Sequence, residues 1–152
     1  MSETFASGII PYIIIEHKKY FLLGLEKSNN YWSGFVGSCQ TGETCVETAV
    51  REFHEETATI FEDYTPFIEE QLKITQPEIE TTPSAKDVYL YFIEFPVDCQ
   101  EYISLFMDKK KDFTNQCFHE KSILKWFSIE EIRRSKRIFN RLKQTLLFKF
   151  NV

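Results

Sequence analysis

Three glutamates, Glu52, Glu55 and Glu56, carry the clearest chemical signal in this sequence. Their spacing of i, i+3 and i+4 would place all three carboxylates on one face of a helix. Like charges within one helical turn repel one another, and a divalent cation seated among them would offset that repulsion. Oxygen ligands alone favour Mg²⁺ or Mn²⁺ over zinc. Arg51, the residue before the first of them, can pair with one carboxylate and fix its position.

Such a cluster suits the chemistry of phosphate groups. A bound cation neutralises diphosphate oxygens, and a carboxylate can activate the attacking water molecule. The competing interpretation is a solvated acidic helix face, which the motif Glu-x-x-Glu-Glu taken alone favours. The residues around the motif therefore have to decide between these two interpretations.

A helix over residues 44–57 is predicted to carry the cluster. Thr44 has the residue type of a helix cap, and Glu47, three positions later, would complete a capping box. Apolar residues recur at helical spacing and form one stripe: Val46, Ala49, Val50 and Phe53. The carboxylates lie largely off this stripe, so they are expected to point away from the core.

Strands are predicted on both sides of this helix, over residues 6–16, 20–25, 32–36, 67–74, 88–95 and 123–127. The stretch 88–95 is almost continuously apolar, which predicts a central strand. Residues 75–86 contain Pro77 and Pro83 among polar residues and are predicted to form a flexible, functional loop. Residues 100–111 fit either a helix or a long loop.

A helical region is predicted to close the chain. Ser128 would cap it, with Glu131 as the partner in a second capping box. The region is expected to break near Ser135 and to continue through Phe148. Strands around a middle helix, followed by a final helix, predict an α/β fold: a mixed β-sheet covered on both faces, or α/β/α sandwich.

Residues 37–59 resemble the Nudix box, Gly-x5-Glu-x7-Arg-Glu-U-x-Glu-Glu-x-Gly-U, in which U is a bulky apolar residue. Five residues separate Gly37 from Glu43, and seven more lead to Arg51. Every polar anchor of the pattern is therefore present and correctly spaced. The flanks agree, with Gly-Ile-Ile-Pro-Tyr at 8–12, the aromatic Trp32, and Trp-Phe-Ser-Ile-Glu-Glu at 126–131.

The sequence departs from the Nudix pattern at a few positions outside the carboxylates. Ala58 and Thr59 replace the terminal Gly and apolar residue of the box. Ala58 is expected to make the helix exit less sharp, because Gly tolerates a positive φ and Ala does not. Phe35-Val36-Gly37 replaces the usual Pro-Gly-Gly, near a backbone carbonyl at Val36 that the resemblance implies as an extra ligand. Because none of these departures removes a carboxylate, an active enzyme is expected.

The resemblance also implies roles for individual residues. Glu52, Glu55 and Glu56 would be the metal ligands, and one of them would act as base. Glu43 and Arg51 would orient them. A further carboxylate ligand from a later loop is typical of the family. Glu120 is the first candidate for it, and the competing interpretation of Glu120 is an ordinary surface residue. Glu78 and Glu80 are weaker candidates. Trp32 and Gly37 are weak candidates for substrate contact.

The predicted function is that of a Nudix-type pyrophosphohydrolase. It would use Mg²⁺ or Mn²⁺ to cleave the diphosphate linkage of a nucleoside diphosphate joined to another moiety. One alternative is an mRNA-decapping Nudix enzyme. Another, of a different class, is a non-catalytic Nudix-fold module that binds nucleotides, and the intact carboxylate set argues against it.

Length and composition set the frame for this function. The 152 residues predict one Nudix domain over residues 1–152. No run of about 18 apolar residues is present, so no membrane contact is expected. Residues 1–4 lack the basic-then-apolar layout of a signal peptide, and the four cysteines show neither CxxC nor zinc spacing. A cytoplasmic, intracellular protein is predicted.

Charge is distributed unevenly along the chain. The net charge is −5, yet no acid interrupts a basic stretch near the end: Arg133, Arg134, Lys136, Arg137, Arg141, Lys143 and Lys149. One interpretation is a closing helix that packs on the sheet through its apolar residues and keeps the cations outside. The other is an RNA backbone bound by Arg133, Arg134, Arg137 and Arg141, which would favour decapping. No residue pattern indicates the oligomeric state.

Overall fold

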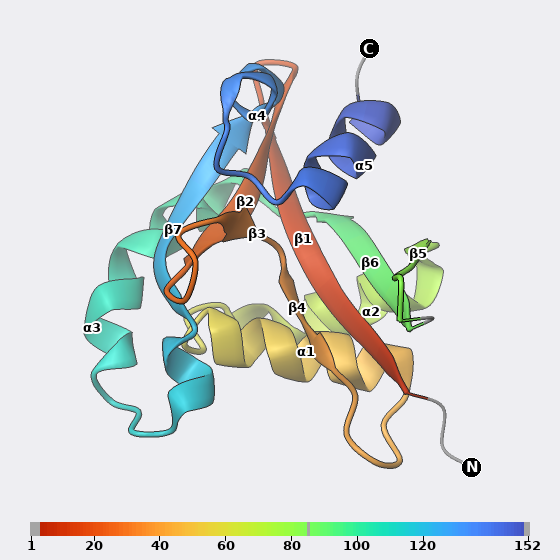
Figure 1. The fold of residues 1–152 in the computed structure, drawn as a ribbon. Helices are drawn as coiled ribbons and strands as arrows, with labels where there is room; N and C mark the ends of the chain where they lie inside the picture. The colour runs from red at the N-terminus through yellow and green to blue at the C-terminus, as the bar shows by residue number, and fades with distance from the viewer. Residues whose placement is uncertain (1–3, 85, 151–152) are drawn as a thin grey trace.

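A mixed sheet forms the middle layer of the structure, a computed structural model that describes residues 4–84 and 86–150 (Figure 1). Its strands follow the order β3 (Trp32–Ser33), β2 (Lys18–Glu26), β1 (Phe5–Ile15), β6 (Asp87–Glu94) and β5 (Glu78–Thr81), while β4 (Phe35–Ser38) pairs with β1 and β7 (Lys121–Ser128) pairs with β2. Strands β1 and β6 run parallel, and the other pairs are antiparallel. The sheet is therefore mixed, as predicted.

Helices cover both faces of this sheet (Figure 1). On one face lie α1 (Cys45–Glu56) and α2 (Thr65–Ile74), and on the other α4 (Ile129–Arg134) and α5 (Asn140–Phe150). The connection from β6 to β7 contains a 3-10 helix (Val97–Leu105), α3 (Phe106–Lys110) and a second 3-10 helix (Gln116–His119). Among the described residues, no helix has the length and apolarity needed to cross a membrane. The predicted α/β/α sandwich is confirmed.

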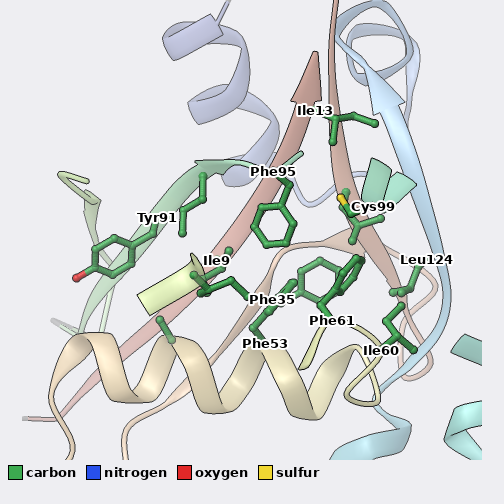
Figure 2. Packing of buried hydrophobic residues seen from close by; sticks show 14 of the residues in the cluster. Ile9, Ile13, Phe35, Phe53, Ile60, Phe61, Tyr91, Phe95, Cys99 and Leu124 are labelled. Atoms are coloured by element: carbon green, nitrogen blue, oxygen red, sulfur yellow. The ribbon is translucent and has the colours of Figure 1, made fainter. Parts of the chain in front are cut away.

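The core between α1 and the sheet fixes the direction of the helix. Phe53 is fully buried there and touches three other rings, with centroid distances of 5.5 Å to Phe35, 5.4 Å to Phe61 and 5.8 Å to Phe95. Figure 2 shows these rings gathered between the helix and the strands. With Phe53 facing the sheet, the carboxylate of the neighbouring Glu52 lies against Gly37 of strand β4.

Both predicted capping boxes are present. The Thr44 hydroxyl accepts a hydrogen bond from the Glu47 backbone at 3.1 Å, and the Glu47 carboxylate accepts one from the Thr44 backbone at 2.9 Å. Ser128 and Glu131 make the same pair of bonds at the start of α4. The predicted break near Ser135 is confirmed, since α4 ends one residue earlier.

Two predictions about the middle of the chain are wrong. Residues 67–74 form most of helix α2 rather than a strand, because Ile68 and Leu72 are one helical turn apart and both are buried, while Pro66 suits the first turn. Residues 75–86 are not all loop, since they include strand β5 at the sheet edge. Ala85 in this stretch lies outside the described residues.

The exit from α1 differs from the expectation of a less sharp turn. Ala58 and Thr59 both adopt positive φ, at 52° and 60°, in the region that the family's Gly would occupy without strain. The Thr59 backbone N–H still bonds the His54 carbonyl at 2.8 Å, as in a tightly closed helix end. The turn is therefore sharp, and the backbone is strained at both residues because each has a side chain in the left-handed region.

Replacing Thr59 with Asn should stabilise the protein. A β-branched residue in the left-handed region costs roughly 1 kcal/mol or more, and Asn tolerates that region. Thermal melts of Thr59→Asn should show a Tm higher by about 2–4 °C. As a control, Thr57→Asn should lower the Tm, because Thr57 has negative φ and its buried hydroxyl donates to the Phe53 carbonyl at 2.6 Å. A lower Tm for Thr59→Asn would contradict this account.

Candidate active site

Strand β4 and helix α1 approach each other closely at Gly37. A Cβ atom at this position would overlap the carboxylate of Glu52. Only a glycine lets the carboxylate lie directly against the strand, so the position requires this residue type for packing. Gly37, a weak candidate for substrate contact, lies against the Glu52 carboxylate in the structure.

Arg51 ties three of the predicted carboxylates together. Its guanidinium contacts Glu43 through two nitrogens, at 2.7 and 2.9 Å, in a bidentate arrangement. A third nitrogen lies 2.9 Å from Glu52 and 3.1 Å from Glu55. The hydrogen bonds from Arg51 lower the pKa of Glu43 to about 2, so Glu43 stays ionised and holds the guanidinium in place.

A different trio of carboxylates converges most tightly. Glu52, Glu56 and Glu120 each bring one oxygen within 4.8 Å of the others. Glu52 and Glu56 come from α1, and Glu120 follows the second 3-10 helix, directly before β7. Glu55 lies on the Arg51 side and does not belong to this trio. The structure therefore places Glu120, the first candidate for a further carboxylate, in the cluster on its solvent-facing side.

Burial and repulsion raise the pKa values of two members of the trio. Glu56 is only 3% exposed, and its burial raises its pKa well above the ordinary range, with the charge of Lys121 acting in the opposite direction. Burial also raises the pKa of Glu120, followed in size by the effect of Glu52. Three crowded carboxylate oxygens and no other donor type fit a hard divalent cation.

Lys121 is the site residue that sequence analysis missed. It is 1% exposed, and its ammonium nitrogen lies 3.6 Å from a Glu56 oxygen, 3.3 Å from a Glu26 oxygen and 2.5 Å from the Ser33 hydroxyl. A lysine at the start of a strand usually faces solvent. Nothing in the local sequence separates Lys121 from Lys125, which is half exposed on the same strand.

The remaining candidates are not members of the carboxylate trio. The ring of Trp32 packs edge-on against Phe127 with a centroid distance of 4.9 Å. Glu78 pairs with Lys149 at 2.7 Å, and Glu80 faces Arg141 at 3.9 Å. The basic residues proposed for RNA are spread over α4, the following loop and α5, with Arg133, Arg134 and Arg137 exposed and Arg141 partly buried.

Glu26 lines two cavities, one of which also borders Glu120. The larger, of about 690 Å³, opens the cluster to solvent and is bordered by Glu26, Lys27, Ser28, Gln116, Cys117, His119 and Glu120. The smaller, of about 260 Å³, lies toward α5 and is lined by Glu26, Ser33, Gly34, Val36, Glu80, Thr82, Val88, Leu90, Phe139, Arg141 and Leu142. The two cavities therefore share Glu26 as a lining residue, and the larger one borders Glu120 of the trio.

Solved structures with a similar fold come from several organisms. An Ap4A hydrolase binary complex from C. elegans has 22% identity, covers 96% of this chain and 95% of its own, and gives a TM-score of 0.62. A Nudix-family hydrolase from Clostridium perfringens has 16% identity, coverage of 99% and 98%, and a TM-score of 0.63. The Nudix domain of Shewanella oneidensis NrtR, complexed with ADP ribose, has 12% identity, coverage of 99% and 89%, and a TM-score of 0.58.

Sequence comparison identifies the family. No curated protein matches this chain. The family model described as NUDIX domain, however, matches residues 9–147, which include the box, the trio and both cavities. This match confirms the expected enzyme class, a pyrophosphohydrolase. The chain belongs to the Nudix family.

Proposed function

We propose that this chain is a Mg²⁺- or Mn²⁺-dependent hydrolase that cleaves the diphosphate linkage of a nucleoside diphosphate joined to another moiety. The observation that carries this proposal is the convergence of Glu52, Glu56 and Glu120 within 4.8 Å beside a solvent-open cavity. The Nudix domain bound to ADP ribose offers support, since ADP ribose is a nucleoside diphosphate joined to a sugar.

Each residue of the cluster has a proposed role. Glu52, Glu56 and Glu120 hold the cation, with Glu55 beside them, and the cation when bound offsets the negative charge of the diphosphate. Arg51, itself fixed by Glu43, keeps Glu52 and Glu55 in position. Glu120 stands at the mouth of the site, where its carboxylate is placed to accept a proton from the attacking water.

The smaller cavity supports a nucleoside as one half of the substrate. Its volume of about 260 Å³ lies near the lower end of ligand sites, which fits one nucleoside better than two. Phe139 is 50% exposed at its rim and offers a ring on which a base can stack. The Arg141 guanidinium can donate hydrogen bonds to acceptors on the edge of a base, and the Glu80 carboxylate can accept them from donors there.

Decapping of RNA stays a prediction. Arg133, Arg134 and Arg137 are exposed and could contact a phosphate backbone. Arg141, however, borders the smaller cavity and faces Glu80, so it fits the nucleoside half of the substrate at least as well. The third alternative, binding without catalysis, is opposed by the complete set of carboxylates.

A substrate panel with product identification tests the proposed reaction. It should contain nucleoside diphosphates linked to sugars or to a second nucleoside, together with a capped RNA and a diphosphate that carries no nucleoside. Turnover should require Mg²⁺ or Mn²⁺, stop with EDTA, and release a nucleoside monophosphate. Tight nucleotide binding without turnover would instead support the non-catalytic module, and turnover of capped RNA alone would support decapping.

Glu56→Gln should abolish most turnover while the fold is kept. The change removes the charge but keeps the shape, so kcat should fall by at least about 10²-fold. Thermal melts should show a smaller stabilisation by Mg²⁺ than in the wild type, because a ligand that binds only the native state raises its stability. The control is Glu47→Gln, an exposed residue of the same helix outside the trio. Near-normal turnover of a folded Glu56→Gln protein would refute the metal site.

Phe139→Leu should weaken the use of nucleotide substrates. Loss of the stacking ring should raise KM about tenfold, in line with roughly 1–3 kcal/mol for a base stacked on an aromatic ring, and leave kcat and metal binding nearly unchanged. The matched control is Phe148→Leu, which is 93% exposed on the same α5 region but outside the smaller cavity. Equal KM values for the two variants would place the base elsewhere.

A further inference from the structure

Lys121 is buried in a position that most lysines avoid. Its side chain is 1% exposed, and its ammonium group donates hydrogen bonds to Ser33 and Glu26 and forms an ion pair with Glu56 at 3.6 Å. Burying a charged group costs free energy unless it is paired and hydrogen-bonded. An apolar residue of similar length would avoid that cost. The retention of a charge here therefore points to the acidic partners rather than to core filling.

The surrounding strands are built to admit this side chain. A Cβ atom at Gly24 on the paired strand β2 would come within 2.7 Å of the Lys121 stem, so glycine leaves the space that the stem fills. The ring of Phe35 lies 5.7 Å from the ammonium nitrogen. Lys110 donates to the Lys121 carbonyl at 2.8 Å and fixes the start of β7. These contacts hold the ammonium against the carboxylates.

The ammonium and a metal ion would share one carboxylate. Glu56 lies 3.6 Å from Lys121 and also belongs to the trio with Glu52 and Glu120. At 3% exposure it has almost no water to balance its charge. Within the described residues, Lys121 is the cation in contact with it. Without a metal, the ammonium is therefore the main group that offsets the charge of Glu56.

We propose that Lys121 is a resident counter-cation of the carboxylate cluster, a positioning residue that holds Glu56 in place and keeps the fold stable while no metal is bound. This inference rests on the metal site of the proposed function. It predicts a specific linkage: the stability lost on removing the Lys121 charge depends on metal, because a bound cation takes over part of its role. A residue that only fills space would show no such dependence.

Thermal melts of the full chain with EDTA and with about 5 mM Mg²⁺ test this linkage. In EDTA, Lys121→Met should lower the Tm by about 10 °C, since it leaves a buried carboxylate without its partner. With Mg²⁺ the deficit should shrink to less than half. The matched control is Lys125→Met on the same strand, whose partner Glu131 lies outside the cluster. Its deficit should be small and equal in both conditions.

A double variant separates charge from packing. Lys121→Met combined with Glu56→Gln removes both charges, so in EDTA it should recover at least half of the Tm that Lys121→Met loses. If Lys121→Met needs Mg²⁺ during purification and unfolds when EDTA is added, the expected linkage is present in its strongest form. Failure of Lys121→Met to fold even with Mg²⁺ would overturn the proposal.

The wild type distinguishes this inference from the proposed metal site. If Mg²⁺ and Mn²⁺ do not raise the wild-type Tm, the metal site itself is wrong. If they do, but the Lys121→Met deficit is the same with and without metal, the metal site stands and the counter-cation role is refuted. Absence of recovery in the double variant would likewise assign Lys121 to packing alone.

Discussion

The close approach of α1 to β4 at Gly37 is the constraint on which the site depends. Glu52 occupies the space that a side chain at Gly37 would need, so the helix can present this carboxylate only against a glycine. Phe53, buried among aromatic rings, sets the depth at which the helix packs. One contact thus links the core to the chemistry, because any shift of the helix on the sheet would move Glu52 and Glu56 together.

Two cations relieve the repulsion within the cluster from different directions. Arg51 contacts Glu43, Glu52 and Glu55. Lys121 contacts Glu56 from the sheet side and shares its charge with Glu26. Neither ion-pair set includes Glu120, which borders the open cavity. The cluster is therefore neutralised where it meets the protein and stays most acidic toward solvent, where a metal ion and a diphosphate would arrive.

Local signals were sufficient to predict much of this arrangement. The box spacing identified Glu43, Arg51 and Glu52, and the capping pairs located both helix starts. The rest depends on tertiary structure. Lys121 looks like any strand lysine until Gly24 and Glu56 are placed around it. The sequence of helix α2 predicts a strand because a short apolar run fits both periods. Whether Glu120 or Glu55 lies nearest Glu56 likewise depends on how the connection before β7 folds back onto helix α1.

The strained exit of α1 shows how the departures from the box pattern are accommodated. Positive φ at Ala58 and Thr59 turns the chain so that Phe61 stacks on Phe53, at 5.4 Å and an interplanar angle of 18°. Burying such a ring contributes roughly 1.5–3 kcal/mol, which offsets a backbone strain of about 1–3 kcal/mol per strained residue only in part. Because Phe61 and Phe53 lock the last turn, Glu56 ends on a fixed backbone even without the family's glycine. The Gly of the box pattern would thus form the same turn with less backbone strain. Its replacement lowers the stability of the fold more than it changes the position of the carboxylates.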